Sequence, residues 1–270
     1  CHTPADSAPG GLADIFAEHL GLVGIEPIQP ASWVPFMKVV VFVPPEALEE
    51  VFAAMANAGA GEIGNYRHCG FRASGIGTFI PGEDAAPYSG EVGKLNLTQE
   101  VRLEMIVPSF LLSRVIKAML SEHPYEEVAY DVYRTDNPVP WGLGRIGIFE
   151  EERTLGDIQA ELAEWCGSRD PRLVGDPPKP VGRVAVVPGA ANSLVGPARR
   201  AGAELLVAGE INYNMSLEAA EAGLALICLG HLESERAFVP MMSEALGALS
   251  AQYGWNLEIE GYYDQEVPWQ

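Results

Sequence analysis

The sequence has no C-x-x-C pair, no apolar run of about 18 residues, and no basic-then-apolar segment at its start. Its cysteines are scattered, which argues against a disulfide framework. A membrane-spanning helix needs a longer apolar run, and a secretory signal needs the missing leader pattern. We therefore expect a cytoplasmic protein. The chain opens with Cys1-His2-Thr3, so either a start methionine was removed or upstream residues are absent.

Basic residues are scarce, with 17 against 37 acidic residues and a formal net charge of −20. Binding to a nucleic-acid backbone requires a basic footprint, and so does binding to an anionic membrane surface. We expect neither partner. A cation site would suit this charge, although acidity more often serves solubility.

The length of 270 residues and the 48% hydrophobic content allow one large globular domain or two ordinary ones. Residues 36–135 show the order βαββαβ, which is typical of a ferredoxin-like unit. The two ends of such a unit lie side by side, so we interpret 36–135 as an α+β insertion in a host domain. The expected strands are 38–43, 65–72, 77–80, 101–107 and 128–133, and the expected helices are 45–57 and 109–120, the latter with Ser109 as its N-cap.

The host domain consists of residues 1–35 and 136–270. The first piece is expected to be a polar loop and one helix over 11–20, after which Pro27, Pro30 and Pro35 end regular structure. Thirty-five residues bury no core alone, so this piece should pack on the second. There, expected strands at 145–149, 183–187, 204–208, 224–228 and 257–262 alternate with helices, which predicts a layered α/β domain with mostly parallel strands. One helix is expected from Thr154 to 166 and another over 231–248.

The most informative stretch is Gly230-His231-Leu232-Glu233-Ser234-Glu235, which follows the apolar strand 224–228. His231 and Glu235 are four residues apart, so on a helix they share one face with Cβ atoms roughly 5–6 Å apart. An imidazole and a carboxylate there can hold a metal ion. Open α/β sheets usually place their chemistry at this end of a strand. The alternative is a surface carboxylate and a histidine that caps a helix.

The metal hypothesis depends on Asp6 meeting that pair in space. Asp6 lies in a turn that leads into the first expected helix, where an aspartate commonly bonds nearby backbone N–H groups. A solvated, frayed terminus is the alternative for both His2 and Asp6.

Two further loops follow expected strands. Residues 189–193 open a helix whose free N–H groups would suit a phosphate or carboxylate, although an ordinary tight turn fits as well. Glu210 ends another strand and could point into a cleft. The alternative is a glutamate favoured by the dipole at a helix start.

Several stretches occur in an order that resembles a known family. They are His2-Thr3-Pro4-Ala5-Asp6 with Gly10-Gly11 and Leu20-Gly21-Leu22, Gly142-Leu143-Gly144-Arg145-Ile146-Gly147, and the 230–235 stretch. Together they resemble the Nif-three-like family, often catalogued as type-2 GTP cyclohydrolase homologues. The insertion resembles the PII/CutA-like domain of the longer members through its segments 64–66, 75–79, 90–93 and 123–127.

This resemblance implies a dinuclear metal site in a toroidal homohexamer, with Asp6, His231 and Glu235 as three of its five ligands. The other two ligands are an adjacent histidine pair upstream of the HTxxD segment, and this chain has no such pair. Roughly the first hundred residues of a full-length member are not in the chain, judged by what an α/β layer needs. At the position of the family's glycine–serine loop this chain has Gly189-Ala190-Ala191. Where the family has histidines after its GE pair, this chain has Tyr213 and Asn214.

Two functional hypotheses follow. The first is a metal-dependent hydrolase or cyclohydrolase acting on a small, nucleotide-like substrate, with one or two Zn, Fe or Mn ions activating water. Glu210 would act as general base or would orient a ligand. The substrate-binding candidates are His2, Gly189, Asn192, Tyr213 and Asn214. The alternative is a non-catalytic, oligomeric scaffold or small-molecule sensor that works through the insertion.

Overall fold

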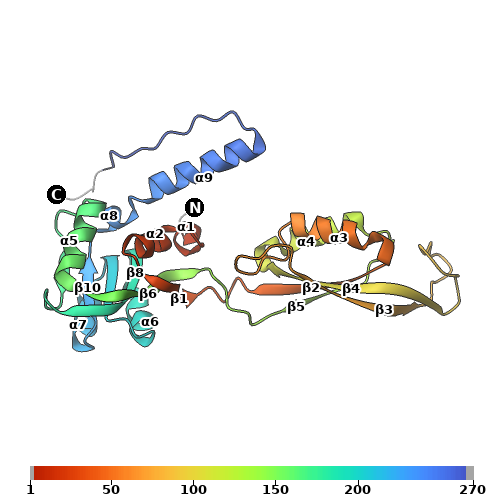
Figure 1. Ribbon diagram of the computed structural model, residues 1–270, viewed down its shortest axis with the longest axis horizontal. Helices are drawn as coiled ribbons and strands as arrows, with labels where there is room; N and C mark the ends of the chain where they lie inside the picture. Colours follow the sequence, from red (N-terminus) through yellow and green to blue (C-terminus); the bar gives the residue numbers. More distant parts are fainter. Residues whose placement is uncertain (1–2, 266–270) are drawn as a thin grey trace. The chain divides into compact units, whose positions relative to one another are not determined.

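The computed structural model describes residues 3–265. The chain divides into two compact units, residues 1–31 with 140–270 and residues 32–139 (Figure 1). We call them unit 1 and unit 2. No helix within 3–265 combines the length and the hydropathy that crossing a membrane requires.

Unit 1 is built on a six-stranded sheet in the order β1-β6-β8-β9-β10-β7. The strands are β1 (Val23–Pro30), β6 (Gly142–Thr154), β7 (Arg172–Val174), β8 (Pro180–Ala190), β9 (Leu205–Glu210) and β10 (Ala225–Cys228). Strand β9 pairs in parallel with β8 and β10, while the β1–β6, β6–β8 and β7–β10 pairs are antiparallel. The layered α/β domain is confirmed, but the expectation of mostly parallel strands is wrong.

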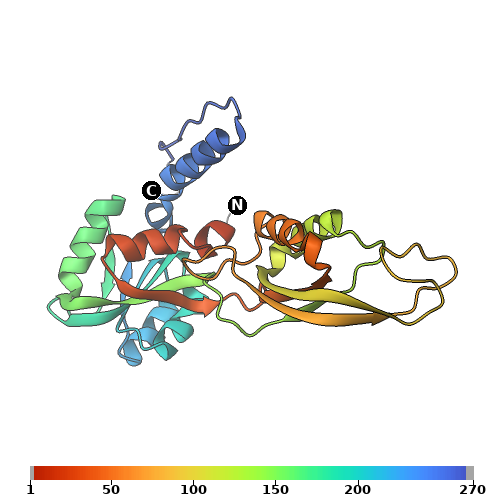
Figure 2. The same cartoon turned by 45° about the vertical axis from the view of Figure 1, so that its right-hand side comes forward.

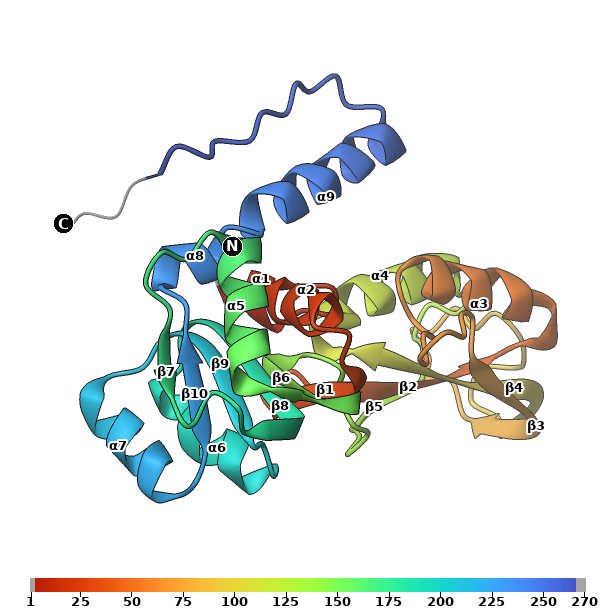
Figure 3. The same ribbon diagram turned by 60° about the vertical axis from the view of Figure 1, so that its left-hand side comes forward.

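Helices cover both faces of this sheet because its central strands are apolar on both sides. Helices α2 (Leu12–His19) and α5 (Leu155–Cys166) cover the face that presents Val184 and Val186. Helices α6 (Val195–Arg200) and α7 (Tyr213–Glu221) cover the opposite face, where Ala185 and Val187 point (Figure 3). The predicted cap of α5 is confirmed, since the Thr154 hydroxyl accepts a hydrogen bond from the Asp157 N–H at 3.2 Å.

Three expectations for the ends of unit 1 are wrong. The polar loop at the start contains a short helix, α1 (Thr3–Ser7). Pro27 and Pro30 do not end regular structure, because both lie in β1, and an edge strand tolerates residues without an N–H. Residues 257–262 form no strand. They lie in the segment that follows α9 (Phe238–Tyr253). The Ser250 hydroxyl of α9 donates a hydrogen bond to the Trp255 carbonyl at the start of this segment, at 2.8 Å.

The single helix expected over 231–248 is interrupted. Helix α8 (His231–Glu235) ends, and α9 begins at Phe238 after a turn. Pro240 explains the break, because a proline has no N–H for the carbonyl four residues earlier and its ring clashes with that carbonyl. The interruption separates the short helix with His231 from the longer one.

Unit 2 has a four-stranded antiparallel sheet in the order β3-β4-β2-β5. Its elements are β2 (Phe36–Val43), α3 (Leu48–Asn57), β3 (Gly70–Phe79), β4 (Asn96–Pro108), α4 (Leu112–Glu122) and β5 (Tyr130–Arg134). Helices α3 and α4 lie on one face of the sheet (Figure 2), and the apolar core lies between them and the strands. The predicted ferredoxin-like order is confirmed.

Two details of unit 2 differ from expectation. The predicted strands 65–72 and 77–80 are replaced by one strand, β3, which pairs with β4 without interruption from Gly70–Met105 to Phe79–Asn96. The glycine-rich stretch therefore stays extended, because pairing with β4 outweighs the turn preference of its glycines. Ser109 is not an N-cap either. It lies in a 3-10 turn (Ser109–Leu111) that precedes α4.

A buried arginine attaches the first two helices to the sheet of unit 1. The Arg145 side chain is 2% exposed, and its guanidinium meets the Asp14 carboxylate through Nε at 2.6 Å and Nη2 at 2.9 Å. Nη2 also donates to the carbonyls of Ser7 and Ala8, and Nη1 donates to those of Gly142 and Gly144. Every donor group of Arg145 therefore has a partner, and α1, α2 and β6 share one charged centre.

We predict that Arg145→Met lowers the free energy of unfolding by about 3–5 kcal/mol, because it leaves a nearly buried carboxylate without its counter-ion. Urea denaturation followed by circular dichroism measures the change. The control is Arg199→Met on the exposed surface of α6, which should stay within about 0.5 kcal/mol of the parent. A similar loss in both variants would contradict the role of Arg145.

Candidate functional site

The carboxyl ends of three neighbouring strands carry the predicted site residues. Gly189 lies near the end of β8, Glu210 is the last residue of β9, and His231 opens α8 just after β10. Helix α8 packs on β8 and β9. Sequence positions that are some twenty residues apart are therefore gathered at one edge of the sheet, where α/β folds usually bind ligands.

His231 lies between two carboxylates. Its Nδ1 is 3.0 Å from Glu210 Oε1, and its Nε2 is 3.3 Å from Glu235 Oε1. The hydrogen bond with Glu210 is the main cause that raises the pKa of His231 above its ordinary value; burial opposes this increase and Glu235 adds to it. When the ring is neutral, a proton on Nδ1 bonds Glu210, and the lone pair of Nε2 faces Glu235.

Glycines let the backbone of β8 and β9 approach this pair closely. Gly189 has φ +69°, and a Cβ there would come within 2.5 Å of Glu235 Oε1 and 3.3 Å of His231 Nε2. A Cβ on Gly209 would collide with the Ser234 hydroxyl. That hydroxyl accepts a hydrogen bond from Gly189 N–H at 2.9 Å and donates to the His231 carbonyl at 2.9 Å. The start of α8 is thus fixed against two strand ends.

Asp6 lies in α1, which Arg145 holds through the carbonyls of Ser7 and Ala8. Strands β6 and β8 are antiparallel with Arg145 opposite Val186, so β6 begins at the edge where β8 ends. Helix α1 is therefore attached at the same edge of the sheet as the histidine site. The role of Asp6 as a metal ligand stays a prediction.

The other predicted residues lie around this edge. Asn192 Oδ1 accepts the N–H of Asn212 at 2.8 Å, which joins the loops after β8 and β9. Tyr213 is 75% exposed and Asn214 is exposed, both in the first turn of α7. His2 lies outside the described residues. Among residues 3–265, no group of three or more His, Cys, Asp or Glu side chains is arranged to hold a metal ion.

Sequence reasoning missed three residues that build the site. Ser234 lies inside the 230–235 stretch, and its small hydroxyl next to a glycine-rich strand end was the available signal. Asn212 caps α7, with Oδ1 accepting the N–H of Met215 at 2.9 Å, as expected of an asparagine just before a helix. Arg145 is an arginine within an apolar strand, which itself indicates a buried ion pair.

The chain is similar to proteins of one known family. The model of the family described as Duf34/NIF3 (NGG1p interacting factor 3) matches residues 1–266. A Bacillus subtilis protein called GTP cyclohydrolase 1 type 2 homolog is 42% identical over 231 residues, which are 85% of this chain and 62% of that protein. A Mycobacterium leprae protein of the same name is 34% identical over 273 residues, covering 99% of this chain and 70% of the relative.

Among solved structures, a Bacillus cereus protein related to NIF3 superposes with a TM-score of 0.86 and 38% sequence identity. The match covers 98% of this chain and 71% of that structure. The chain thus spans about two thirds of the length of its relatives, at 62% for the Bacillus subtilis protein. The similarity includes both units.

We predict that the contact between His231 and Glu210 stabilises the fold more at low pH than at high pH. A raised folded-state pKa means that the contribution is fully present below the unfolded pKa of about 6.5 and is lost as the pH rises through the folded pKa. In urea denaturation with a chelator present, Glu210→Gln should lower stability at about pH 5.5, by less than about 1 kcal/mol, and hardly at about pH 9.

The control for this experiment is Glu150→Gln, which changes an exposed carboxylate of β6. It should show no such pH dependence. An equal loss at both pH values in Glu210→Gln would mean that the imidazole charge plays no part.

Proposed function

The chain belongs to the Duf34/NIF3 family, and from this we propose that the strand-end site of unit 1 binds a divalent metal ion and hydrolyses a small, nucleotide-like substrate. The names of the relatives, GTP cyclohydrolase 1 type 2 homolog, support a substrate of that class. The observation that carries the proposal is the orientation of His231 between Glu210 and Glu235.

The donor set fits a metal of the Zn, Fe or Mn group. Nε2 of His231 and Oε1 of Glu235 lie 3.3 Å apart, and both are donors that such ions accept. A carboxylate on the second ring nitrogen of a metal-bound histidine fixes the tautomer and the ring orientation, and Glu210 occupies that position. The absence of a Cβ at Gly189 keeps space open beside both donors.

Asp6 is the proposed third ligand, since α1 is attached at the same sheet edge. Within residues 3–265 no three such side chains are already arranged for an ion, so Asp6 would have to move next to His231 and Glu235 when the metal binds. Three protein ligands and a water complete a tetrahedral site, so one ion is compatible with this set. By the resemblance, a second ion would use an adjacent histidine pair that this chain does not have. A bound metal would supply a water of lowered pKa as nucleophile.

The remaining residues have distinct tasks in this proposal. Glu210 holds the proton on Nδ1 of His231 and thereby keeps Nε2 available as a donor. The N–H groups of Gly189 and Ala191 are bonded to the Ser234 hydroxyl and the Glu210 carbonyl, so the backbone N–H groups of residues 192 and 193 and the side-chain amide of Asn192 would bind an anionic part of the substrate. Tyr213 and Asn214, both exposed at the start of α7, would contact its remainder.

A second function rests on unit 2. A cavity there is lined only by residues of that unit, which favours a small-molecule sensor as the alternative role of the insertion. Both functions can coexist, because the cavity and the metal site share no residue.

We predict that the purified protein binds close to one equivalent of Zn, Fe or Mn per chain after reconstitution. The double variant His231→Ala with Glu235→Ala should hold less than about a tenth of an equivalent, because it loses both contacting donors. Mass spectrometry of the metal content measures this, and circular dichroism checks the fold. The control is His68→Ala, an exposed histidine of unit 2. A metal-free parent protein, or a double variant that keeps its metal, would contradict the site.

We also predict a homo-oligomer, in line with the family's toroidal hexamer. Sedimentation velocity should give a mass close to six times the chain mass of 29.0 kDa. A species of 29.0 kDa across the concentration range would contradict the prediction.

A further inference from the structure

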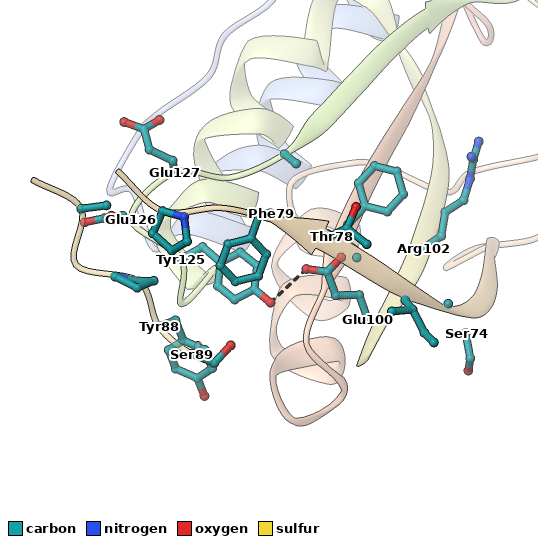
Figure 4. Close-up of a pocket in the computed structure, with 18 of the residues that line it drawn as sticks. Ser74, Thr78, Phe79, Tyr88, Ser89, Glu100, Arg102, Tyr125, Glu126 and Glu127 are labelled. Atoms are coloured by element: carbon teal, nitrogen blue, oxygen red, sulfur yellow. Dashed lines mark hydrogen bonds between the residues drawn. The ribbon is translucent and has the colours of Figure 1, made fainter. Parts of the chain in front are cut away.

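A cavity of about 650 Å³ lies in unit 2, at the end of the sheet where β3 and β4 form a two-stranded ribbon (Figure 4). Its walls are this ribbon, the segment after β3, and residues 125–129 that precede β5. The volume falls within the range of about 300–1,000 Å³ that is typical of small-molecule sites. No part of the metal proposal uses these residues.

Hydrogen bonds fix the wall that follows β3. Glu126 Oε1 accepts the N–H of Ala86 at 2.9 Å, and the Tyr88 hydroxyl donates to Glu46 at 3.1 Å. The hydroxyls of Ser89 and Thr98 are 3.3 Å apart. The wall is therefore bonded to the segment between α4 and β5, to the 3-10 turn (Pro45–Ala47) that precedes α3, and to β4, so the cavity has a defined shape before any ligand binds.

Apolar side chains of this cavity remain open to water. Ile76 is 63% exposed and Tyr88 is 51% exposed. Phe42, Phe79 and the ring of Tyr125 complete an apolar and aromatic surface. A ligand that covers this apolar surface removes it from water, which lowers the free energy. The lining therefore fits a ligand with an apolar body.

Glu100 brings a carboxylate into this apolar surface. Its Oε1 accepts the Tyr125 hydroxyl at 3.0 Å, as the dashed line in Figure 4 shows. The carboxylate lies over Gly77, where a Cβ would collide with Oε2, so only a glycine permits this position. Within residues 3–265, no group donates a hydrogen bond to Oε2. Burial, together with the bond to Glu100, raises the pKa of Tyr125, so its hydroxyl stays a donor.

The charge of the lining favours a cation. The lining contains three carboxylates, those of Glu100, Glu126 and Glu127, and one guanidinium, that of Arg102. Arg102 is engaged outside the cavity lining, since its Nε donates to Glu104 Oε1 at 2.7 Å. An anionic ligand would meet three carboxylates and one arginine that is already paired with Glu104. A cation would meet an open carboxylate oxygen instead.

The aromatic rings suit the same ligand. The rings of Tyr88 and Tyr125 have centroids 5.7 Å apart and are tilted by 44°. Faces of aromatic rings attract organic cations within about 6 Å, and aromatic groups beside a carboxylate recognise ammonium groups. Apolar surface, aromatic rings and the carboxylate thus point to one class of compound.

We propose that the cavity of unit 2 binds a small organic cation, an amine or quaternary ammonium compound with an apolar body. The charged group lies against Glu100 and the two tyrosine rings, and the apolar body covers Ile76 and Phe79. This binding site is independent of the metal proposal and assigns the insertion a ligand of its own.

The test is isothermal titration calorimetry of the full chain with benzyltrimethylammonium, with phenylacetate as a probe of similar size and opposite charge. We expect the cation to bind at micromolar to millimolar concentration and phenylacetate to bind at least about ten-fold more weakly. Glu100→Gln keeps an acceptor for the Tyr125 hydroxyl but removes the charge, and should weaken cation binding about ten-fold. Tyr88→Ala should also weaken it by removing one ring.

The matched control is Glu50→Gln, which removes an exposed carboxylate of α3 outside the cavity and should leave the affinity unchanged. Thermal unfolding of each variant verifies that unit 2 is folded. Equal binding of both probes, equal affinity of the parent and Glu100→Gln, or no binding of the cation up to about 10 mM would overturn the proposal. The proposal would also be overturned if sedimentation showed an oligomer and calorimetry showed that the oligomer does not bind the cation.

Discussion

The fold of unit 1 depends on the buried guanidinium of Arg145. One side chain bonds the Asp14 carboxylate of α2, two carbonyls at the end of α1 and two carbonyls of β6. A charge buried to this degree is costly unless its donors have partners, and this arrangement of the segments supplies a partner for each donor. That arrangement attaches α1 and Asp6 at the edge of the sheet where β8 ends. The candidate metal site therefore relies on a residue that contacts none of its donors.

Local sequence signals predicted the larger elements because those elements depend on local chemistry. The apolar stripes of α2 and α3 and the cap at Thr154 need no distant partner. The errors occur where distant partners decide. Prolines are acceptable in β1 only because that strand lies at an edge, and the glycines of β3 stay extended only because β4 pairs with them. The three-residue strand β7 is too short for a periodic signal, and its pairing with β10 gives it its form.

The candidate site was predictable in part for the same reason. Helical spacing brings His231 and Glu235 together, and no other information is needed. The contact with Glu210 arises from the parallel pairing of β9 with β10, which places the two strand ends side by side. The sequence did not indicate the role of Gly189 and Gly209. Only the structure shows that a Cβ at either position would collide with Glu235 or Ser234. The cavity of unit 2 could not be predicted, since it is formed by the irregular segment after β3 folding against Glu126.

Strand β1 has a consequence for how the molecule can associate. Two of its eight residues are prolines, and its pairing with β6 is irregular between Val23 and Glu26. Missing donors and local bulges are the means by which natural proteins prevent an open sheet border from recruiting a further chain. Pairing of a further strand with β1 is therefore disfavoured, and a contact at that border would rely on side-chain surfaces rather than on an intermolecular backbone ladder.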